Sequence, residues 1–355
     1  MKIAIDCRNI GKSGIGTFIE NVLYELLNNH SEHEYLLIKD KDTHIETYSS
    51  RTSFLLTDIK QFSLSELFCF PTEEINKCDA YFTPYISIPG GIKIPTYSTI
   101  HDMVFFDVDG LTTPLGKFIR KIYYKRAITL SNALFTVSEF SRRRLLYHFH
   151  TNKDINIAYN GLSRTIQDYK RDVDFEKKDY FIFVGNIKRH KGLHILVDAY
   201  GKARKNGLKS KLIIVGSNDK LRTADLLLAQ TIKEMEGIEF TGWVDNQKLI
   251  RLISEAKALV QPSFYEGFGI PPLEALSLGT DIIISDIPVF KELYSEIPNC
   301  FFGAGDSDDL ANKMMNFVPN PKLDYYKNLF VDKYSYQKTA NIIAETIKLD
   351  VQKIS

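Results

Sequence analysis

Short runs of β-branched and aromatic residues recur along the whole chain and predict buried strands. The runs in the first half are KIAID, EYLLI, AYFTPY, TYSTI, ALFTVS and INIAYN, and those in the second half are YFIFVG, KLIIVG, GIEFTG, ALVQPS and DIIIS. Between many of them lie amphipathic stretches such as 193–206 and 247–258, whose apolar residues recur three and four positions apart, as in helices. This alternation predicts an α/β fold in which helices cover both faces of parallel sheets.

A polar, charged segment at 164–179 divides the strands into two groups. Because 355 residues is long for one hydrophobic core, two domains are expected. We predict an N-terminal Rossmann-like domain at 1–163, a linker at 164–179 and a second Rossmann-like domain at 180–333. The helical pattern at 334–355 could pack on either half, including back on the first domain. Ligand crevices in such sheets open at the carboxyl ends of the strands, so two facing crevices would form one cleft.

The composition is that of an ordinary soluble protein, with 44% hydrophobic and 25% charged residues. Its 45 Lys and Arg residues balance 44 Asp and Glu residues, so no overall field favours a nucleic-acid partner. The four cysteines lack the spacing of a metal site or disulfide framework, which favours a reducing cytosol. The chain opens on a strand-like run without signal-peptide features, and no stretch reaches the roughly 18 apolar residues that span a bilayer. We therefore expect a cytoplasmic protein whose membrane contact is at most peripheral.

The strongest chemical signal is the segment 262–279, PSFYEGFGIPPLEALSLG. A strand ends at Val260, a loop with two glycines follows, and Pro271 and Pro272 stand where proline is tolerated, in the first turn of a helix. Unpaired amides at such a helix start point at an anion such as a diphosphate. The amides expected to do so are those of Phe268, Gly269 and Ile270.

Two glutamates flank this predicted anion site. Glu266 precedes the loop, and Glu274 lies about one turn into the helix. Carboxylates repel phosphate, so these two are expected to accept hydrogen bonds from sugar or ribose hydroxyls. A capping acid at a helix start would explain one glutamate, but a pair separated by a Gly-x-Gly loop favours a functional site.

Two further loops follow predicted strands. Lys191 comes after YFIFVG and before an amphipathic helix, which places it at a crevice mouth, although a solvated surface lysine is the alternative. The glycine loop at 11–16 precedes a helix expected from Thr17 and could be a phosphate cradle or a plain turn. A Walker loop would need glycine at Asp6 and a dinucleotide fingerprint would need it at Ile19, so both motifs fail.

Polar residues also end two strands of the first half. His101 and Asp102 follow the apolar run 96–100, and Ser138 and Glu139 end another strand. A polar strand end and a helix N-cap are the structural alternatives. The D-x-D strings at 107–109 and 172–174 do not follow a clear apolar strand with a phosphate loop, so no metal site is expected.

Together these segments resemble the retaining glycosyltransferases of family 4, which have the GT-B fold. The E-x7-E motif of that family is matched by Glu266 and Glu274. The resemblance covers nearly the whole chain, through SGIGTFIENVLYEL, TIHDMVFFD, TVSEFSRRRL, Asn160-Gly161, VGNIKRHKGL and GWV. It implies two Rossmann-like domains whose parallel sheets face one another across a cleft.

The resemblance also implies an activity. A hexose would pass, with retention, from a nucleotide-diphosphate sugar to a glycan or lipid-linked glycan in polysaccharide assembly. GDP-mannose is the first expectation for the donor, followed by UDP and dTDP sugars. The nucleotide sugar would be a co-substrate, and neither a cofactor nor a metal is expected.

The same resemblance assigns roles to matched positions in the second domain. Glu274 would hold the donor ribose, while Glu266 and the backbone of 267–270 would hold the transferred sugar and the diphosphate. Lys191 would neutralise the phosphates. Many members carry an arginine near this lysine at positions that here hold His190 and Asn186, so Arg189 is expected to supply the second cation.

In the first domain, Gly14 and Gly16 would let backbone amides approach the diphosphate. His101 would contact the transferred sugar, and Asp102 would orient its ring. The predicted catalytic residues are thus His101 and Glu266; the donor-binding residues are Gly14, Gly16, Arg189, Lys191, Val244, Gly267, Phe268, Gly269, Ile270 and Glu274; and Asp102, Ser138 and Glu139 are further candidates.

Two other functional classes remain open from the residues alone. A glycoside hydrolase or phosphorylase also uses paired carboxylates, although it has no need of an anion site between them. A non-catalytic sugar or nucleotide binder needs only the cleft.

Basic and aromatic residues gather in FIRKIYYKR at 118–126 and RRRLLY at 142–147. Such segments suit an anionic membrane face, here the inner face of the plasma membrane, or a lipid-diphosphate acceptor; two solvated helix faces are the alternative. The cations concerned are Arg142, Arg143, Arg144, Lys117, Arg120, Lys121, Lys125 and Arg126.

Overall fold

The chain forms two compact units in the computed structural model, which describes residues 1–12, 14–45, 51–169, 176–216 and 226–354. The first unit comprises Met1–Asn160 together with Ser335–Ser355, and the second comprises Gly161–Tyr334. Each unit has its own parallel sheet and its own apolar core.

The sheet of the first unit has seven parallel strands in the order β3-β2-β1-β4-β5-β6-β7. The predicted apolar runs are its central strands, and β4, β5 and β6 are buried along their whole length. Edge strand β3 is mostly exposed, as expected of a strand with one neighbour. The strands are β1 (Lys2–Asp6), β2 (Glu34–Lys39), β3 (Thr52–Leu56), β4 (Ala80–Thr83), β5 (Thr96–Ile100), β6 (Ala133–Thr136) and β7 (Ile155–Ile157). The helices are α1 (Gly14–Asn29), α2 (Leu64–Phe68), η1 (Ile75–Lys77), α3 (Val104–Asp107), α4 (Pro114–Leu130), α5 (Glu139–His148) and α14 (Tyr336–Ile354).

The C-terminal helix α14 packs on the first unit, beside α1. Its buried face recurs at helical spacing and includes Tyr336, Ala340 and Ile347. The Tyr336 ring meets the edge of Phe18 at 6.1 Å between centroids, and Asn341 Oδ1 lies 2.9 Å from Nε2 of His30. The end of the chain therefore completes the core of the unit in which the chain begins.

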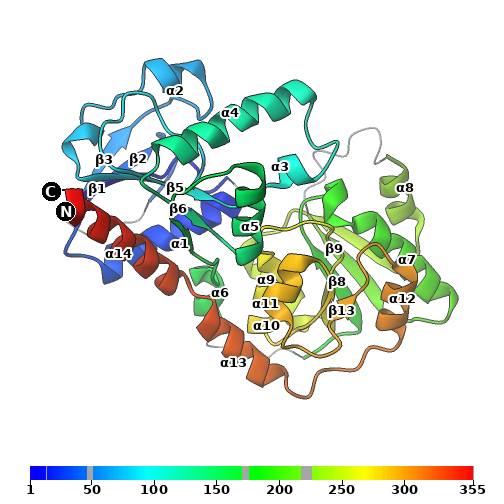
Figure 1. Ribbon diagram of the computed structural model, residues 1–355. Coiled ribbons are helices and arrows are strands. Elements are labelled where there is room, and N and C mark those ends of the chain that lie inside the picture. The colour runs from blue at the N-terminus through cyan, green and yellow to red at the C-terminus, as the bar shows by residue number, and fades with distance from the viewer. Residues whose placement is uncertain (13, 46–50, 170–175, 217–225, 355) are drawn as a thin grey trace. The chain divides into compact units, whose positions relative to one another are not determined.

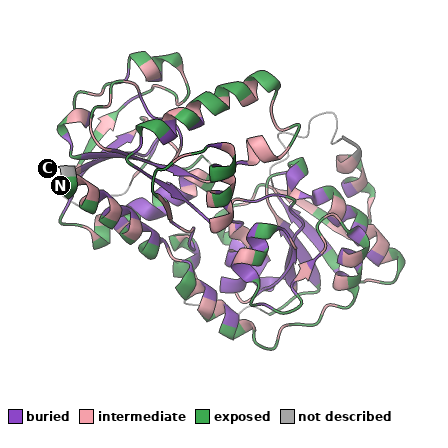
Figure 2. Ribbon diagram, in the orientation of Figure 1, coloured by how far each residue is buried: buried purple, intermediate pink, exposed green. Residues whose placement is uncertain are grey.

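The sheet of the second unit has six parallel strands in the order β10-β9-β8-β11-β12-β13. Helices cover the apolar faces of its strands. The strands are therefore mostly buried and are coloured purple in Figure 2. The strands are β8 (Tyr180–Val184), β9 (Lys211–Val215), β10 (Ile238–Gly242), β11 (Ala258–Gln261), β12 (Asp281–Ser285) and β13 (Phe301–Phe302). The helices are α6 (Arg164–Tyr169), η2 (Arg189–Lys191), α7 (Leu193–Lys205), α8 (Leu226–Glu234), α9 (Asn246–Glu255), α10 (Ile270–Ser277), α11 (Pro288–Tyr294), α12 (Ser307–Met315) and α13 (Leu323–Lys333).

Two local expectations differ from the structure. The segment predicted as a linker, 164–179, contains helix α6, which buries Ile166 in the second unit. Its end is also attached there, because Nζ of Lys177 donates to the Ser254 carbonyl at 2.8 Å. The sequence did not predict this short helix, because a charged segment with one buried apolar residue has no helical pattern of apolar positions. The D-x-D string at 172–174 lies outside the described residues.

The helix predicted from Thr17 begins at Gly14, so the two glycines of the first loop belong to the first turn of α1.

Candidate functional site

Gly269 shapes the loop that leads from β11 into α10. Its φ of 89° lies in the left-handed region, and a Cβ at this position would overlap the Phe290 ring, so both conformation and space require glycine. Pro271 and Pro272 follow in the first turn, where no helical amide bond is lost. The start of α10 therefore follows the carboxyl end of the central strand β11 through the loop 262–269.

An ion pair between Lys191 and Glu266 lies beside this loop. Nζ of Lys191 is 2.8 and 2.7 Å from the two carboxylate oxygens of Glu266. The Glu266 side chain is 8% exposed and that of Lys191 is 23% exposed, so a ligand could reach the cation more easily than the anion. A carboxylate this far from water is stable only with such partners.

The two loops that carry this pair are held in close contact. Gly192, directly after the lysine, has a φ of 70°, and a Cβ there would overlap the carbonyl oxygen of Pro262. The amide of Phe264 donates to the His190 carbonyl at 2.8 Å. Because β8 and β11 are also paired in the sheet, the fold brings together residues that are far apart in sequence.

Sequence reasoning missed two residues that hold Glu266 in place. Ser263 Oγ donates to Oε1 of Glu266 at 2.7 Å, and Nε2 of Gln261 donates to Ser263 Oγ at 3.0 Å. Gln261 also lies 3.4 Å from Oε1 of Glu266. A glutamine at the end of an otherwise apolar buried strand is the sequence signal that could have found this network.

Glu274 lies on α10 and is half-buried. Burial raises the pKa of its carboxyl to about 7. At neutral pH this group is therefore close to its midpoint, and an approaching hydroxyl donor would favour the ionised form.

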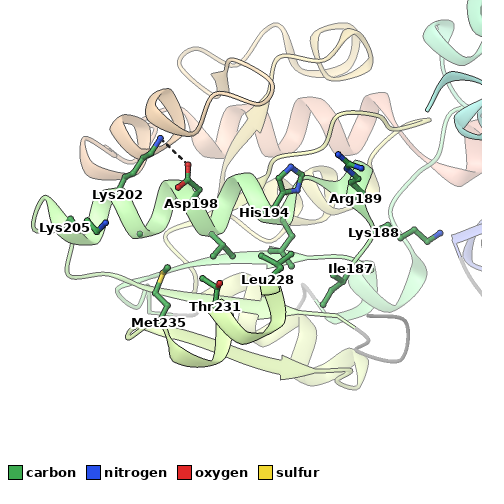
Figure 3. Close-up of a pocket in the computed structure, with 13 residues that line it drawn as sticks. Ile187, Lys188, Arg189, His194, Asp198, Lys202, Lys205, Leu228, Thr231 and Met235 are labelled. Atoms are coloured by element: carbon green, nitrogen blue, oxygen red, sulfur yellow. Dashed lines mark ion pairs between the residues drawn. The ribbon is translucent and has the colours of Figure 1, made fainter. Parts of the chain in front are cut away.

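Arg189 and His190 directly precede Lys191. His190 is buried, and burial together with the Lys191 charge lowers its pKa to about 4, so it is neutral at pH 7. Arg189 lines a pocket of about 630 Å³ along α7 and α8, with His194 and Lys188 (Figure 3). Lys191 is thus the cation that the structure pairs with Glu266, and the role of Arg189 at the phosphates stays a prediction.

His101 follows β5 in the first unit. Its Nε2 lies 2.8 Å from the Pro84 carbonyl oxygen, which can only accept, so Nε2 carries the hydrogen. Burial lowers the pKa of the ring to about 4, and the edge of Phe18 packs against it at 4.9 Å between centroids. At neutral pH the ring is therefore uncharged, with a lone pair on Nδ1 that can accept a hydrogen bond.

The neighbouring candidates have structural roles in the same unit. Oδ1 of Asp102 accepts from the Val104 amide at 3.0 Å at the start of α3, while the His101 ring is oriented by the Pro84 carbonyl. Ser138 is the N-cap of α5, and Glu139 pairs with Arg142 at 3.0 Å. These contacts favour the helix-capping interpretation of Ser138, and participation of either residue in a site stays a prediction.

The two predicted glycines of α1 differ in their surroundings. A Cβ on Gly16 would overlap the carbonyl oxygen of Asn9, whereas Gly14 is exposed with open space beside it. Only Gly16 is required by the packing of the first turn.

Other predicted donor residues lie in loops of the second unit. Val244 is half-buried and follows Gly242, whose φ is 69°, and Trp243, whose side chain is 79% exposed. The Phe268 ring packs against Tyr334 at 5.4 Å between centroids, so its side chain belongs to the core.

The predicted membrane-binding cations fall into two groups. Arg144 pairs with Asp107, and Arg120 lies 3.6 Å over the Phe105 ring. Lys121, Lys125 and Arg143 are exposed. The other cations also have internal contacts: Arg142 with Glu139, Arg126 with the carbonyls of Ile88 and Pro89, and Lys117 with the carbonyl of Phe106. Many of these cations therefore make contacts within the fold. The sequence alone could not distinguish such cations from those of a binding surface.

Within the described ranges, no three histidine, cysteine or acidic side chains are grouped so that they could hold a metal ion. None of the described helices is long and apolar enough to cross a membrane.

Solved glycosyltransferase structures share this architecture. One is Anabaena Alr3699/HepE in complex with UDP and glucose, with a TM-score of 0.72 and 15% identity over 98% of this chain and 99% of that chain. Another is the lipopolysaccharide outer core galactosyltransferase WaaB in its apo form, with a TM-score of 0.66 and 19% identity over 97% of this chain and all of that chain. The two parallel-sheet units thus define a GT-B fold.

Sequence relatives give the family. Residues 165–329 match the family model for glycosyl transferases group 1. The O-antigen chain mannosyltransferase RfbU of Salmonella typhimurium is 27% identical over 70% of this chain and 69% of its own length. The O-antigen biosynthesis glycosyltransferase WclY of Escherichia coli is 24% identical over 84% of this chain and 83% of its own length. The second unit of the chain thus matches this glycosyltransferase family, and the chain is similar to enzymes of O-antigen synthesis.

Proposed function

We propose that the protein transfers a hexose, with retention of configuration, from a nucleotide-diphosphate sugar to a glycan or lipid-linked glycan in polysaccharide assembly. The observation that carries this proposal is the Lys191–Glu266 pair beside the glycine loop of α10. It combines an accessible cation, a helix start and a tethered carboxylate, which are the groups that a sugar diphosphate needs. GDP-mannose is the preferred donor in this proposal, because relatives include two O-antigen chain mannosyltransferases. UDP and dTDP sugars come next, and UDP is bound in the HepE structure.

In this proposal the donor diphosphate draws Lys191 away from Glu266. The ammonium group and the amides at the start of α10 then stabilise the charge that develops on the leaving diphosphate, without a metal ion. Glu266 is left to accept hydrogen bonds from the transferred sugar, and Glu274 accepts from the ribose. His101, neutral and with a free Nδ1 lone pair, accepts from a sugar hydroxyl rather than acting as an acid.

A thermal-shift panel of GDP, UDP, dTDP and ADP tests the donor assignment. A ligand present at about 100 times its dissociation constant stabilises by about 2.7 kcal/mol, so the cognate nucleotide should raise the Tm most. The preferred nucleotide sugar is then incubated with lipid-linked glycan acceptors, and transfer is measured together with the anomeric configuration of the product. Stabilisation by none of the four nucleotides would exclude the proposed donor site.

We also propose that the first unit binds the anionic inner face of the plasma membrane through Lys121, Lys125 and Arg143. Each exposed cation near such a surface is worth about 1 kcal/mol, and exposed Phe118 and Ile122 lie on the same helix as the two lysines. The protein should sediment with vesicles that contain anionic lipid and detach as salt rises. Failure to bind such vesicles at low salt would exclude this surface. Arg142 and Arg144 are unsuitable for charge reversal because they form internal ion pairs.

A further inference from the structure

A small apolar pocket opens in the first unit between α3, α4 and α5. Its volume is about 370 Å³, near the lower end of pockets that hold small molecules. Aromatic rings and a proline form most of its wall, and two lysines and a histidine supply its polar side chains. The lining residues are Phe106, Pro114, Lys117, Phe118, Lys121, His148 and Phe149.

The wall of this pocket is firmly built. The Phe106 ring packs edge-on against Phe149 at 5.4 Å between centroids and lies 5.5 Å from the ring of His148. Asp107, the next residue, accepts from His148 Nε2 at 2.6 Å and from Arg144, which ties α3 to α5. The cavity therefore lies between packed rings and not between loose surface side chains.

An exposed apolar stripe leads to the mouth of the pocket. Leu115, Phe118, Ile119 and Ile122 occupy positions i, i+3, i+4 and i+7 of α4, and all four are exposed. The outer face of α4 is accordingly green along much of its length in Figure 2. Phe118 belongs both to the stripe and to the pocket wall.

The polar groups of the pocket select the kind of ligand. Lys117 and Lys121 can only donate, Lys117 now to the Phe106 carbonyl at 3.2 Å, and the phenylalanine and proline side chains of the wall offer no hydrogen-bonding group. A glycan or a peptide would leave many polar groups unpaired there. A lipid phosphate meets both requirements. Its hydrocarbon chain would pack against the apolar wall, and its phosphate would pair with the lysines.

We propose that this pocket binds the first part of the hydrocarbon chain of a lipid that carries a phosphate or diphosphate, with the phosphate beside Lys121 and Lys117. The rest of a long chain would follow the stripe on α4. The inference rests on the proposed function in one respect, namely that such a lipid carries the acceptor glycan.

Isothermal titration with farnesyl phosphate, below its aggregation concentration, tests the proposal. Farnesol and inorganic phosphate serve as separate probes of the chain and the head group. The wild-type protein should bind farnesyl phosphate at least about tenfold more tightly than either one, because both parts of the ligand contribute.

Matched controls come from other positions of the same unit. Phe118→Asp and Leu130→Asp place a charge on α4 side chains that are 61% and 43% exposed, but only Phe118 lines the pocket. Lys121→Glu and Lys93→Glu form a second pair of exposed lysines, of which only Lys121 lines it. The Phe118 and Lys121 variants should lose about tenfold or more in affinity, and the Leu130 and Lys93 variants should stay near wild type.

Three results would overturn the proposal: no binding by the wild-type protein, equal losses within each matched pair, or equal affinity for inorganic phosphate. Equal losses would indicate partition onto the general surface of the unit. Nucleotide binding is measured in the same variants, because Lys191, Glu266 and Glu274 lie in the other unit. Loss of nucleotide stabilisation in the wild type contradicts the proposed function alone, whereas loss of lipid binding contradicts only the pocket.

Discussion

Nζ of Lys191 contacts both carboxylate oxygens of Glu266, although 75 residues separate the two in sequence. Each charge is the other's partner, so in the proposed function a diphosphate would compete with the Glu266 carboxylate for the lysine. Glu266 would then lose its counter-charge while more deeply buried than the lysine, with Ser263 still donating a hydrogen bond to it.

A double-mutant cycle separates stability from binding at this pair. Lys191→Ala should lower the free energy of unfolding by about 3 kcal/mol, because a buried carboxylate loses its counter-charge. Adding Glu266→Gln should restore most of that loss, while affinity for the nucleotide diphosphate stays low because the cation is still missing. Urea unfolding and nucleotide titration measure the two quantities. Unchanged nucleotide affinity in Lys191→Ala would remove the lysine from the donor site.

Glu274→Gln should stabilise the protein above pH 7 and change little near pH 4.5. Burial raises the pKa of Glu274 from 4.5 to about 7, so within that window the folded state holds a proton that the unfolded state has released. Stability therefore falls as pH rises through the window, by at most about 3 kcal/mol, and glutamine removes this loss. Urea unfolding of both proteins at about pH 5 and about pH 8 is the measurement. If the two proteins differed in free energy of unfolding by the same amount at both pH values, the raised pKa of Glu274 would be contradicted.

If Glu274 accepts from the ribose as proposed, Glu274→Ala should weaken nucleotide binding, because the hydroxyls would lose their acceptor. One hydrogen bond to a charged group is worth about 1.5 to 3 kcal/mol, so a loss of roughly tenfold or more is expected. Thermal shift with the cognate nucleotide measures it, and the control is an unchanged fold by circular dichroism. Wild-type affinity would return Glu274 to a purely structural role.

If His101 contacts the transferred sugar as proposed, His101→Ala should reduce kcat by about tenfold or more while nucleotide affinity stays nearly unchanged. The pKa of about 4 also means that His101 is neutral from about pH 5 to 8, so it should contribute no limb to the rate profile in that range. Turnover and nucleotide binding are compared across pH. A variant with wild-type turnover would exclude the residue from the reaction.

Gly16→Ala should destabilise the protein by about 2 kcal/mol, because its Cβ would overlap the Asn9 carbonyl. Gly14→Ala is the matched control two residues away; it has open space and should be neutral or slightly stabilising in a helix. Thermal unfolding of the two variants gives the comparison. Equal Tm values would show that the loop relaxes without cost.

Transfer should persist in EDTA if Lys191 and the start of α10 supply the positive potential for the leaving group, as proposed. Initial rates with the preferred nucleotide sugar are measured before and after chelation. Abolition by EDTA with recovery on adding manganese or magnesium would contradict metal independence.

Local sequence signals predicted local features well. Pro271 and Pro272 placed the start of α10, and the apolar runs matched buried strands such as β5 and β11. Contacts between distant residues carried no such signal. The ring of His101 is oriented by Pro84, and Arg144 by Asp107 at a separation of 37 residues, so neither partner could be read from spacing. Helix α6 was not predicted, because polar and charged residues surround its one buried side chain, Ile166.

The return of α14 to the first unit makes the second unit an insertion within the first, entered after Asn160 and left before Ser335. Gly161–Tyr334 is therefore one continuous stretch, and a fragment with these limits contains Lys191, Glu266 and Glu274. The complementary fragment would need Asn160 joined to Ser335 by a short tether, since deletion of α14 would uncover the Phe18 side of its core. The proposed donor residues of the second unit and the proposed lipid pocket of the first can thus be tested in separately expressed fragments, whose limits follow from the path of the chain.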